Sequence, residues 1–243
     1  MEPILLVFIY ALITAIATGV GALPFFITRN IPKKMMGLAN GAAAGLMTAA
    51  SFNLIYEGLE DVVMLTGGML TGLLFILASE KFLKKHGELR FPHKDQLQGQ
   101  KMLLIMAVMT LHSFTEGVGV GVSFGRGESF GTFISAAIAL HNVPEGLAIS
   151  LILVPRGISA LKAAGWSIFS SLPQPLMAVP AFLFVEQFEA FLPAGLGFAA
   201  GAMLWMVVAE ILPESCEEAE PSQVGVVMTL SIIAMLLFQV WLA

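Results

Sequence analysis

Two passages of the chain each place a histidine and a glutamate four residues apart within an apolar run. They are Leu-His-Ser-Phe-Thr-Glu-Gly, with His112 and Glu116, and Leu-His-Asn-Val-Pro-Glu-Gly, with His141 and Glu145. On a helix, residues i and i+4 lie on one face. The two runs are consecutive, so as membrane helices they are antiparallel and can bring these faces together. Imidazoles and carboxylates bind divalent transition metals, so the pattern predicts a metal site.

The apolar surroundings of these four residues strengthen that prediction. Ionisable groups in the middle of membrane segments are costly and mark functional sites. The alternative is that each His–Glu pair is only a hydrogen bond that fixes helix packing. Two such pairs on neighbouring helices would be an expensive way to hold a bundle together. A bound cation would also supply the counter-charge that the two carboxylates need, because no Lys or Arg occurs at that depth.

The composition indicates an all-α membrane protein that forms a single transmembrane domain over residues 1–243. Hydrophobic residues make up 57% of the chain and charged residues 12%, which is too few to cover the surface of a soluble domain of this length. The sequence has no basic patch interleaved with aromatic residues, so it does not indicate a nucleic-acid partner. Eight apolar runs are each about long enough to span a bilayer, and 84–100 is an aqueous loop. The runs are 3–27, 36–57, 62–83, 101–124, 130–153, 160–184, 191–213 and 222–242.

The basic residues predict the orientation of these helices. Eleven of the twelve Lys and Arg residues fall in 29–34, 81–101 and 156–162, three regions that share one face of an eight-helix protein. Only Arg126 falls on the opposite face. By the positive-inside rule the basic face is cytoplasmic, with 84–100 as a cytoplasmic loop. Both termini are then extracytoplasmic.

An internal similarity favours a transporter built from inverted repeats. Ala-Ala-Gly-Leu-Met at 43–47 resembles Ala-Ala-Gly-Ala-Met at 199–203, and eight crossings give these two helices opposite directions. Transporters with such repeats bind their substrate near the midplane, between the halves. The alternative is that small residues recur wherever membrane helices pack closely.

Other side chains are candidates to line the same site. Ser113 and Asn142 follow the two histidines and could offer oxygen atoms. Gln174 lies between two prolines that interrupt the helix at mid-membrane, where irregular backbone usually lines a cavity. Met47 could offer a thioether, although a methionine is more often simply core. Glu210 is a candidate for an exit position or for the end of its helix.

Together these motifs resemble the ZIP (Zrt/Irt-like) metal transporters, in particular their short GufA-like members, over the whole chain. The resemblance rests on the two His-x-x-x-Glu-Gly segments, the Ala-Ala-Gly-x-Met segment, the proline-flanked Gln174 and Glu-x-x-Pro-Glu at 210–214. It implies a site, often binuclear, on the fourth and fifth helices that admits zinc, and sometimes iron, manganese or cadmium, toward the cytoplasm.

The resemblance also assigns residues to the two metal positions. The first position corresponds to His112, Glu116, His141 and Glu145, with Met47 as a further contributor. At the second position this chain departs from the family. Ser113 stands where the family often has Asn, Asn142 where many bacterial members have an acidic residue, and Gln174 in place of the usual Glu.

The sequence therefore predicts an integral protein of the cell membrane that transports divalent metal ions, with Zn²⁺ as the first-choice substrate and Fe²⁺, Mn²⁺ and Cd²⁺ as alternatives. No prosthetic group is expected, and a homodimer is a candidate assembly. One rival is an intramembrane metal-dependent hydrolase, although its usual His-Glu-x-x-His motif is missing. Another is a structural membrane protein whose His–Glu pairs only pack.

Overall fold

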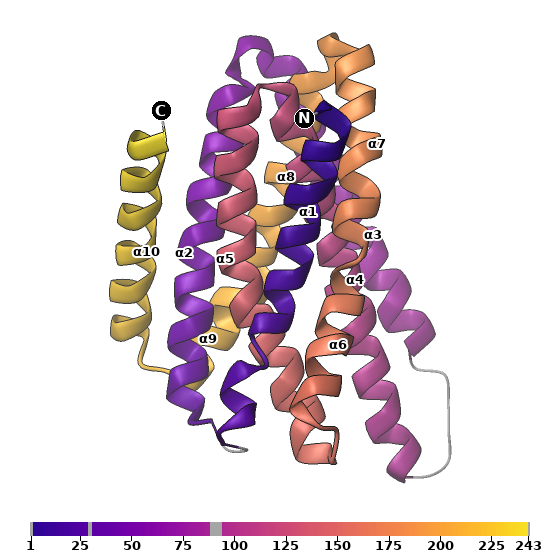
Figure 1. Cartoon of the computed structure of the whole chain (residues 1–243), viewed down its shortest axis with the longest axis vertical. Helices are drawn as coiled ribbons and strands as arrows, with labels where there is room; N and C mark the ends of the chain where they lie inside the picture. The colour runs from indigo at the N-terminus through magenta and orange to yellow at the C-terminus, as the bar shows by residue number, and fades with distance from the viewer. Residues whose placement is uncertain (1, 29–30, 88–93, 243) are drawn as a thin grey trace.

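The computed structural model describes residues 2–28, 31–87 and 94–242, and within them every regular element is a helix (Figure 1). Both termini lie toward the upper end of the bundle in Figure 1. The helices are α1 (Pro3–Val20), α2 (Lys33–Glu57), α3 (Val62–Gly87), α4 (Lys94–Gly125), α5 (Glu128–Leu153), α6 (Ala160–Ser171), α7 (Pro173–Gln187), α8 (Leu192–Met206), α9 (Leu212–Glu218) and α10 (Pro221–Leu242).

Each predicted apolar run corresponds to a helix or to a broken helix. The sixth run is divided into α6 and α7 at Leu172, because Pro173 lacks the N–H that would continue the ladder and instead begins a new helix. The seventh run consists of α8, a π-helical turn at Val207–Ile211, and α9. The helices α3 and α4 extend into the predicted loop 84–100, whose central part, residues 88–93, lies outside the described residues.

Seven stretches of the described chain are long and apolar enough to cross a membrane, which confirms an all-helical protein with several candidate crossings. Large apolar side chains such as Ile13, Phe52 and Leu176 are exposed on the outside of the bundle, as a lipid-facing surface requires. Among the predicted crossings, α4 is the one outside this set. The count of eight therefore stays a prediction.

Glycines bring pairs of helices into backbone contact. A Cβ atom at Gly68 or Gly72 of α3 would overlap a carbonyl oxygen of α8, and one at Gly197 or Gly201 of α8 would overlap a carbonyl oxygen of α3. Small residues at helix interfaces allow this close approach in membranes, where packing replaces the hydrophobic effect as the driving force. The same kind of contact joins α2 to α10 at Gly45.

Glycines also join the helices that carry the predicted ligands. Gly117 of α4 faces the backbone of α7 at Gln174, and Gly146 of α5 faces the backbone of α1 at Thr18. Gly19 of α1 also faces α6 at Ile168, and Gly37 of α2 faces the backbone of α9 at Ser215. Since α6 runs directly into α7 and α8 leads into α9, these contacts link α1 and α4–α7 as a first helix group, and α2, α3 and α8–α10 as a second helix group. Two glycines that face across the groups, Gly119 and Gly195, contact side chains rather than backbone.

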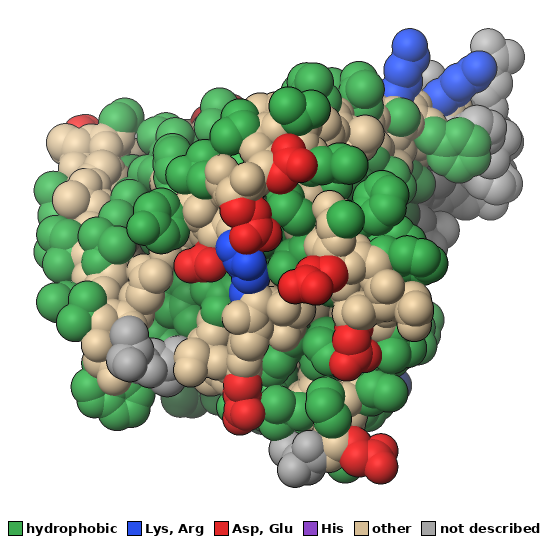
Figure 2. All heavy atoms as spheres, turned by 90° about the horizontal axis from the view of Figure 1, so that it is seen from above, with side chains coloured by type: hydrophobic (Ala, Val, Ile, Leu, Met, Phe, Trp, Pro, Cys, Tyr) green, Lys and Arg blue, Asp and Glu red, His purple; other side chains and the backbone are tan. Residues whose placement is uncertain are grey.

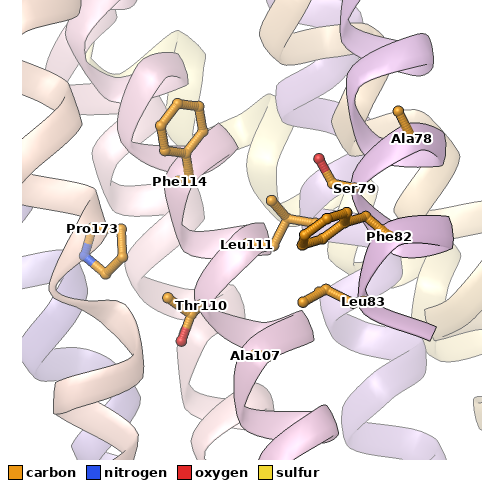
Figure 3. Close-up of a pocket in the computed structure, with 9 residues that line it drawn as sticks. All are labelled: Ala78, Ser79, Phe82, Leu83, Ala107, Thr110, Leu111, Phe114 and Pro173. Atoms are coloured by element: carbon orange, nitrogen blue, oxygen red, sulfur yellow. The ribbon is translucent and has the colours of Figure 1, made fainter. Parts of the chain in front are cut away.

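An apolar groove of about 550 Å³ lies between α3, α4 and the start of α7 (Figure 3). Its lining residues are Ala78, Ser79, Phe82, Leu83, Ala107, Thr110, Leu111, Phe114 and Pro173. None of these side chains is ionisable, so the groove is not a place to bind a metal ion. It suits the hydrocarbon tails of a bilayer.

Candidate metal site

Three of the predicted ligands meet in the middle of the bundle. Glu116 comes from α4, and His141 and Glu145 come from α5. One ligand atom from each residue lies within 4.8 Å of the other two. The two carboxylates and the imidazole thus form a cluster that could hold one divalent ion with nitrogen and oxygen ligands.

The cluster is buried, and three of its four carboxylate oxygens accept no hydrogen bond within the described structure. Glu116 is 0% exposed, His141 5% and Glu145 8%. Neither carboxylate oxygen of Glu145 accepts a hydrogen bond within the described structure, and the same holds for Oε1 of Glu116, which lies 3.5 Å from Nδ1 of His141. Buried polar atoms are normally paired, and a buried charge is costly without a counter-charge. A cation would supply that counter-charge.

The fourth predicted ligand, His112, pairs with Glu210. Its Nε2 atom lies 2.8 Å from Oε2 of Glu210, which the π-helical turn at Val207–Ile211 presents from the second helix group. Such turns occur often at functional sites. Pro213 gives a physical reason for this one, since it has no N–H to donate to the carbonyl of Ala209.

A small cavity connects the cluster to the His112–Glu210 pair. Its volume is about 60 Å³, enough for one or two waters. From the cluster it extends toward the end of the bundle where α2 begins, reaching Asn40, Ala148 and Glu214. His112, His141, Glu145 and Glu210 all line it, and Pro144 lies on its wall within α5. His112 therefore faces the same space as the cluster.

On the other side of Glu116, amides take the place of further metal ligands. Nε2 of Gln174 donates a hydrogen bond of 2.6 Å to Oε2 of Glu116. Oε1 of Gln174 accepts bonds from Oγ1 of Thr14 at 2.6 Å and from Nδ2 of Asn142 at 3.1 Å. Nδ2 of Asn142 also donates to the carbonyl oxygen of Thr14 at 2.8 Å.

This amide network fixes the direction of the Gln174 side chain. Its carbonyl oxygen faces Nδ2 of Asn142 and the hydroxyl of Thr14, and its NH₂ group points at Glu116. An N–H donor carries partial positive charge and cannot ligate a cation. Gln174 therefore stabilises the Glu116 carboxylate by donating a hydrogen bond to it.

The two remaining candidates, Ser113 and Met47, have other surroundings. Ser113 lies 3.5 Å from the hydroxyl of Ser171, which in turn lies 2.8 Å from that of Thr18. Met47 is buried in the apolar core formed by both helix groups. Sequence reasoning missed Thr14, whose role in the amide network has no local signal, because nothing near it sets it apart from other threonines of apolar runs, such as Thr18.

Comparison with known proteins places these residues in a family. The family model described as ZIP Zinc transporter matches residues 90–239, which include both His–Glu passages and Gln174. An Arabidopsis thaliana protein named as a zinc transporter is 48% identical over 93% of this chain, which spans only 37% of that protein. Zinc transporter GufA of Myxococcus xanthus is 32% identical over 84% of this chain and 86% of its own length.

A third relative extends the similarity to nearly the whole chain. Zinc transporter ZupT of Oceanobacillus iheyensis is 30% identical over 96% of this chain and 97% of its own length. The relatives are named as transporters, which does not favour the hydrolase alternative. With the ligand cluster on α4 and α5, these similarities confirm the resemblance that the motifs indicated: the chain belongs to the ZIP zinc transporter family.

Proposed function

We propose that this protein carries Zn²⁺ across the cell membrane toward the cytoplasm. The observation that carries the proposal is the buried cluster of Glu116, His141 and Glu145, whose unpaired carboxylate oxygens need a cation, in a chain of the ZIP family. His112 and Glu210 would receive the ion next, because they line the cavity that leads away from the cluster. Fe²⁺, Mn²⁺ and Cd²⁺ also bind nitrogen and oxygen ligands of this kind and are secondary candidate substrates.

The transport step would be a movement of one helix group against the other. The cluster belongs entirely to the first helix group, whereas Glu210 belongs to the second. Close contacts at glycines link the helices within each group, and side chains fill the space between the groups at Gly119 and Gly195. A relative movement would open the cluster to one side of the membrane and then to the other, as in other transporters with a midplane site.

Zinc uptake by proteoliposomes that contain the purified protein tests this function. We expect time-dependent entry of zinc that saturates with concentration and that slows at acidic external pH, since bound ligands must be deprotonated. Elemental analysis of the same protein should find zinc in a fixed ratio to the chain. Absence of both uptake and stoichiometric metal would reject the proposal.

Eight crossings with both termini outside form a second part of the proposal. Arg126, directly after α4, contacts Glu57 and Glu60 at the turn between α2 and α3. Since α3 ends at the opposite end of the bundle (Figure 1), α4 has to traverse its full length. This supports α4 as a membrane crossing despite its polar first turns.

Reporter fusions test this topology. A reporter after Ala243 or near Glu128 should be extracytoplasmic, and one near Lys94 should be cytoplasmic, because eleven of the twelve basic residues fall on the Lys94 side. A cytoplasmic signal from the fusion after Ala243 would contradict the eight-helix count. Homodimer formation is a further proposal, which light scattering of the detergent-solubilised protein tests.

A further inference from the structure

Arg126 ties together two turns at the end of the bundle where both termini lie. Its Nη2 atom donates to the carbonyl oxygen of Glu57 at 2.7 Å and lies 2.9 Å from Oε2 of Glu60. Its Nε atom lies 3.3 Å from Oε2 of Glu57. Figure 2 views this end from above and shows acidic side chains gathered around a basic one in the middle. The Arg126 side chain is only 27% exposed, so water screens these contacts incompletely.

These contacts cross between the two helix groups. Arg126 lies in the turn between α4 and α5, the helices that carry the metal cluster, and so belongs to the first helix group. Glu57 ends α2, and Glu60 lies in the short turn before α3, so both belong to the second helix group. Asp61 is already engaged, since its Oδ1 accepts bonds from the backbone N–H groups of Val63 and Met64.

The metal cluster is closed on the side that faces Arg126. Along α2, α4 and α5, the residues between the cluster and that end include Met47, Val120, Ile134 and Ile138, all buried in one apolar core. The cavity beside the cluster extends in the other direction, toward the start of α2. The ion pairs of Arg126 therefore form at the closed end of the boundary between the helix groups.

We propose that Arg126 locks this end of the transporter, holding the two helix groups together while the metal cluster faces the opposite side. The inference rests on the proposed transport by alternating exposure of the cluster. Opening the boundary at this end would separate Arg126 from Glu57 and Glu60 and leave like charges facing water. Without the Arg126 charge, these ion pairs no longer oppose opening, so the fraction of molecules open at this end should rise.

Cysteine accessibility measures this opening directly. The background variant is Cys216→Ser, which removes the only cysteine. Ser51→Cys then places a thiol on α2 between Met47 and Glu57, at a position that is 0% exposed. In detergent without metal, the labelling rate with a water-soluble maleimide reports how often the boundary opens.

We expect Arg126→Gln to raise this labelling rate by roughly 2–30-fold, the range for losing two partly exposed ion pairs. The control is Arg156→Gln, because Arg156, in the turn that follows α5, donates to the carbonyl of Ile152 in the last turn of α5 and so stays within the first helix group. Its labelling rate should equal that of the background protein. The charge swap Arg126→Glu with Glu60→Arg, made together with Glu57→Gln so that no carboxylate faces the new one, should return labelling toward the background rate, which a general loss of folding would not do.

Two results would overturn the lock. One is an unchanged labelling rate in Arg126→Gln. The other is a charge-swap variant that labels as fast as Arg126→Gln does. Because the thiol is labelled in detergent without zinc, this readout is independent of uptake and of membrane orientation. Failure of zinc uptake with a positive labelling result would thus reject the proposed function and keep the lock.

Discussion

Glu145→Gln should abolish zinc uptake while the protein stays folded. The change keeps the size of the side chain and removes one of the two carboxylate charges in the cluster, so the ion loses both a ligand and half of its neutralising charge. Changes to residues that only support a ligand typically cost about 10–100-fold in metal affinity or activity. Loss of a ligand itself should exceed this range. Uptake of radioactive zinc by proteoliposomes measures the effect.

Thermal unfolding separates this loss from misfolding. In the metal-free protein Glu145 is a buried carboxyl group without a hydrogen-bond partner near a second carboxylate, so its replacement should leave the unfolding temperature equal to or above that of the wild type. Zinc at about 100 times its Kd stabilises a one-site protein by about 2.7 kcal/mol, and this stabilisation should vanish in the variant. The matched control, Glu189→Gln, changes an exposed glutamate and should leave uptake and stabilisation intact. If Glu145→Gln took up zinc at the wild-type rate, Glu145 would not be a ligand of the site.

Much of the fold follows from the sequence because a bilayer imposes strong rules. Every backbone group must be satisfied within the segment, so apolar runs of sufficient length become helices. The break between α6 and α7 follows from Pro173, which cannot donate a ladder hydrogen bond. The meeting of Glu116 with His141 and Glu145 follows from the i, i+4 spacing on consecutive helices.

Features that depend on distant partners could not be predicted. The bond from Thr14 to Gln174 joins residues 160 positions apart, and nothing near Thr14 distinguishes it from other threonines in apolar helices. The His112–Glu210 pair depends on a π-helical turn. Pro213 favours such a turn at this place, but a proline in an apolar helix does not in general predict one. A sequence pattern gives the face of a helix, whereas the partner on that face is decided by the packing of the whole bundle.

Metal content is expected to be one tightly bound zinc per chain in the wild type and two in Gln174→Glu. Glu116 and Glu145 bring two negative charges, which neutralise one divalent ion. The groups on the other side of Glu116 are the amides of Gln174 and Asn142. Gln174 donates a hydrogen bond to Glu116, so it does not present an oxygen ligand to a metal ion there. A second cation there would face the repulsion of the first without new negative charge at low dielectric.

The substitution Gln174→Glu would supply the negative charge that a second cation needs. Nε2 of Gln174 lies 2.6 Å from Oε2 of Glu116, so the substitution places two carboxylates in contact and favours a cation between them. Elemental analysis of purified protein counts the ions, with Gln187→Glu as the control, since Gln187 is exposed at the other end of the same helix. Two tightly bound ions in the wild type would show that amides suffice as ligands. A single ion in Gln174→Glu would show that charge does not set the number of metal ions.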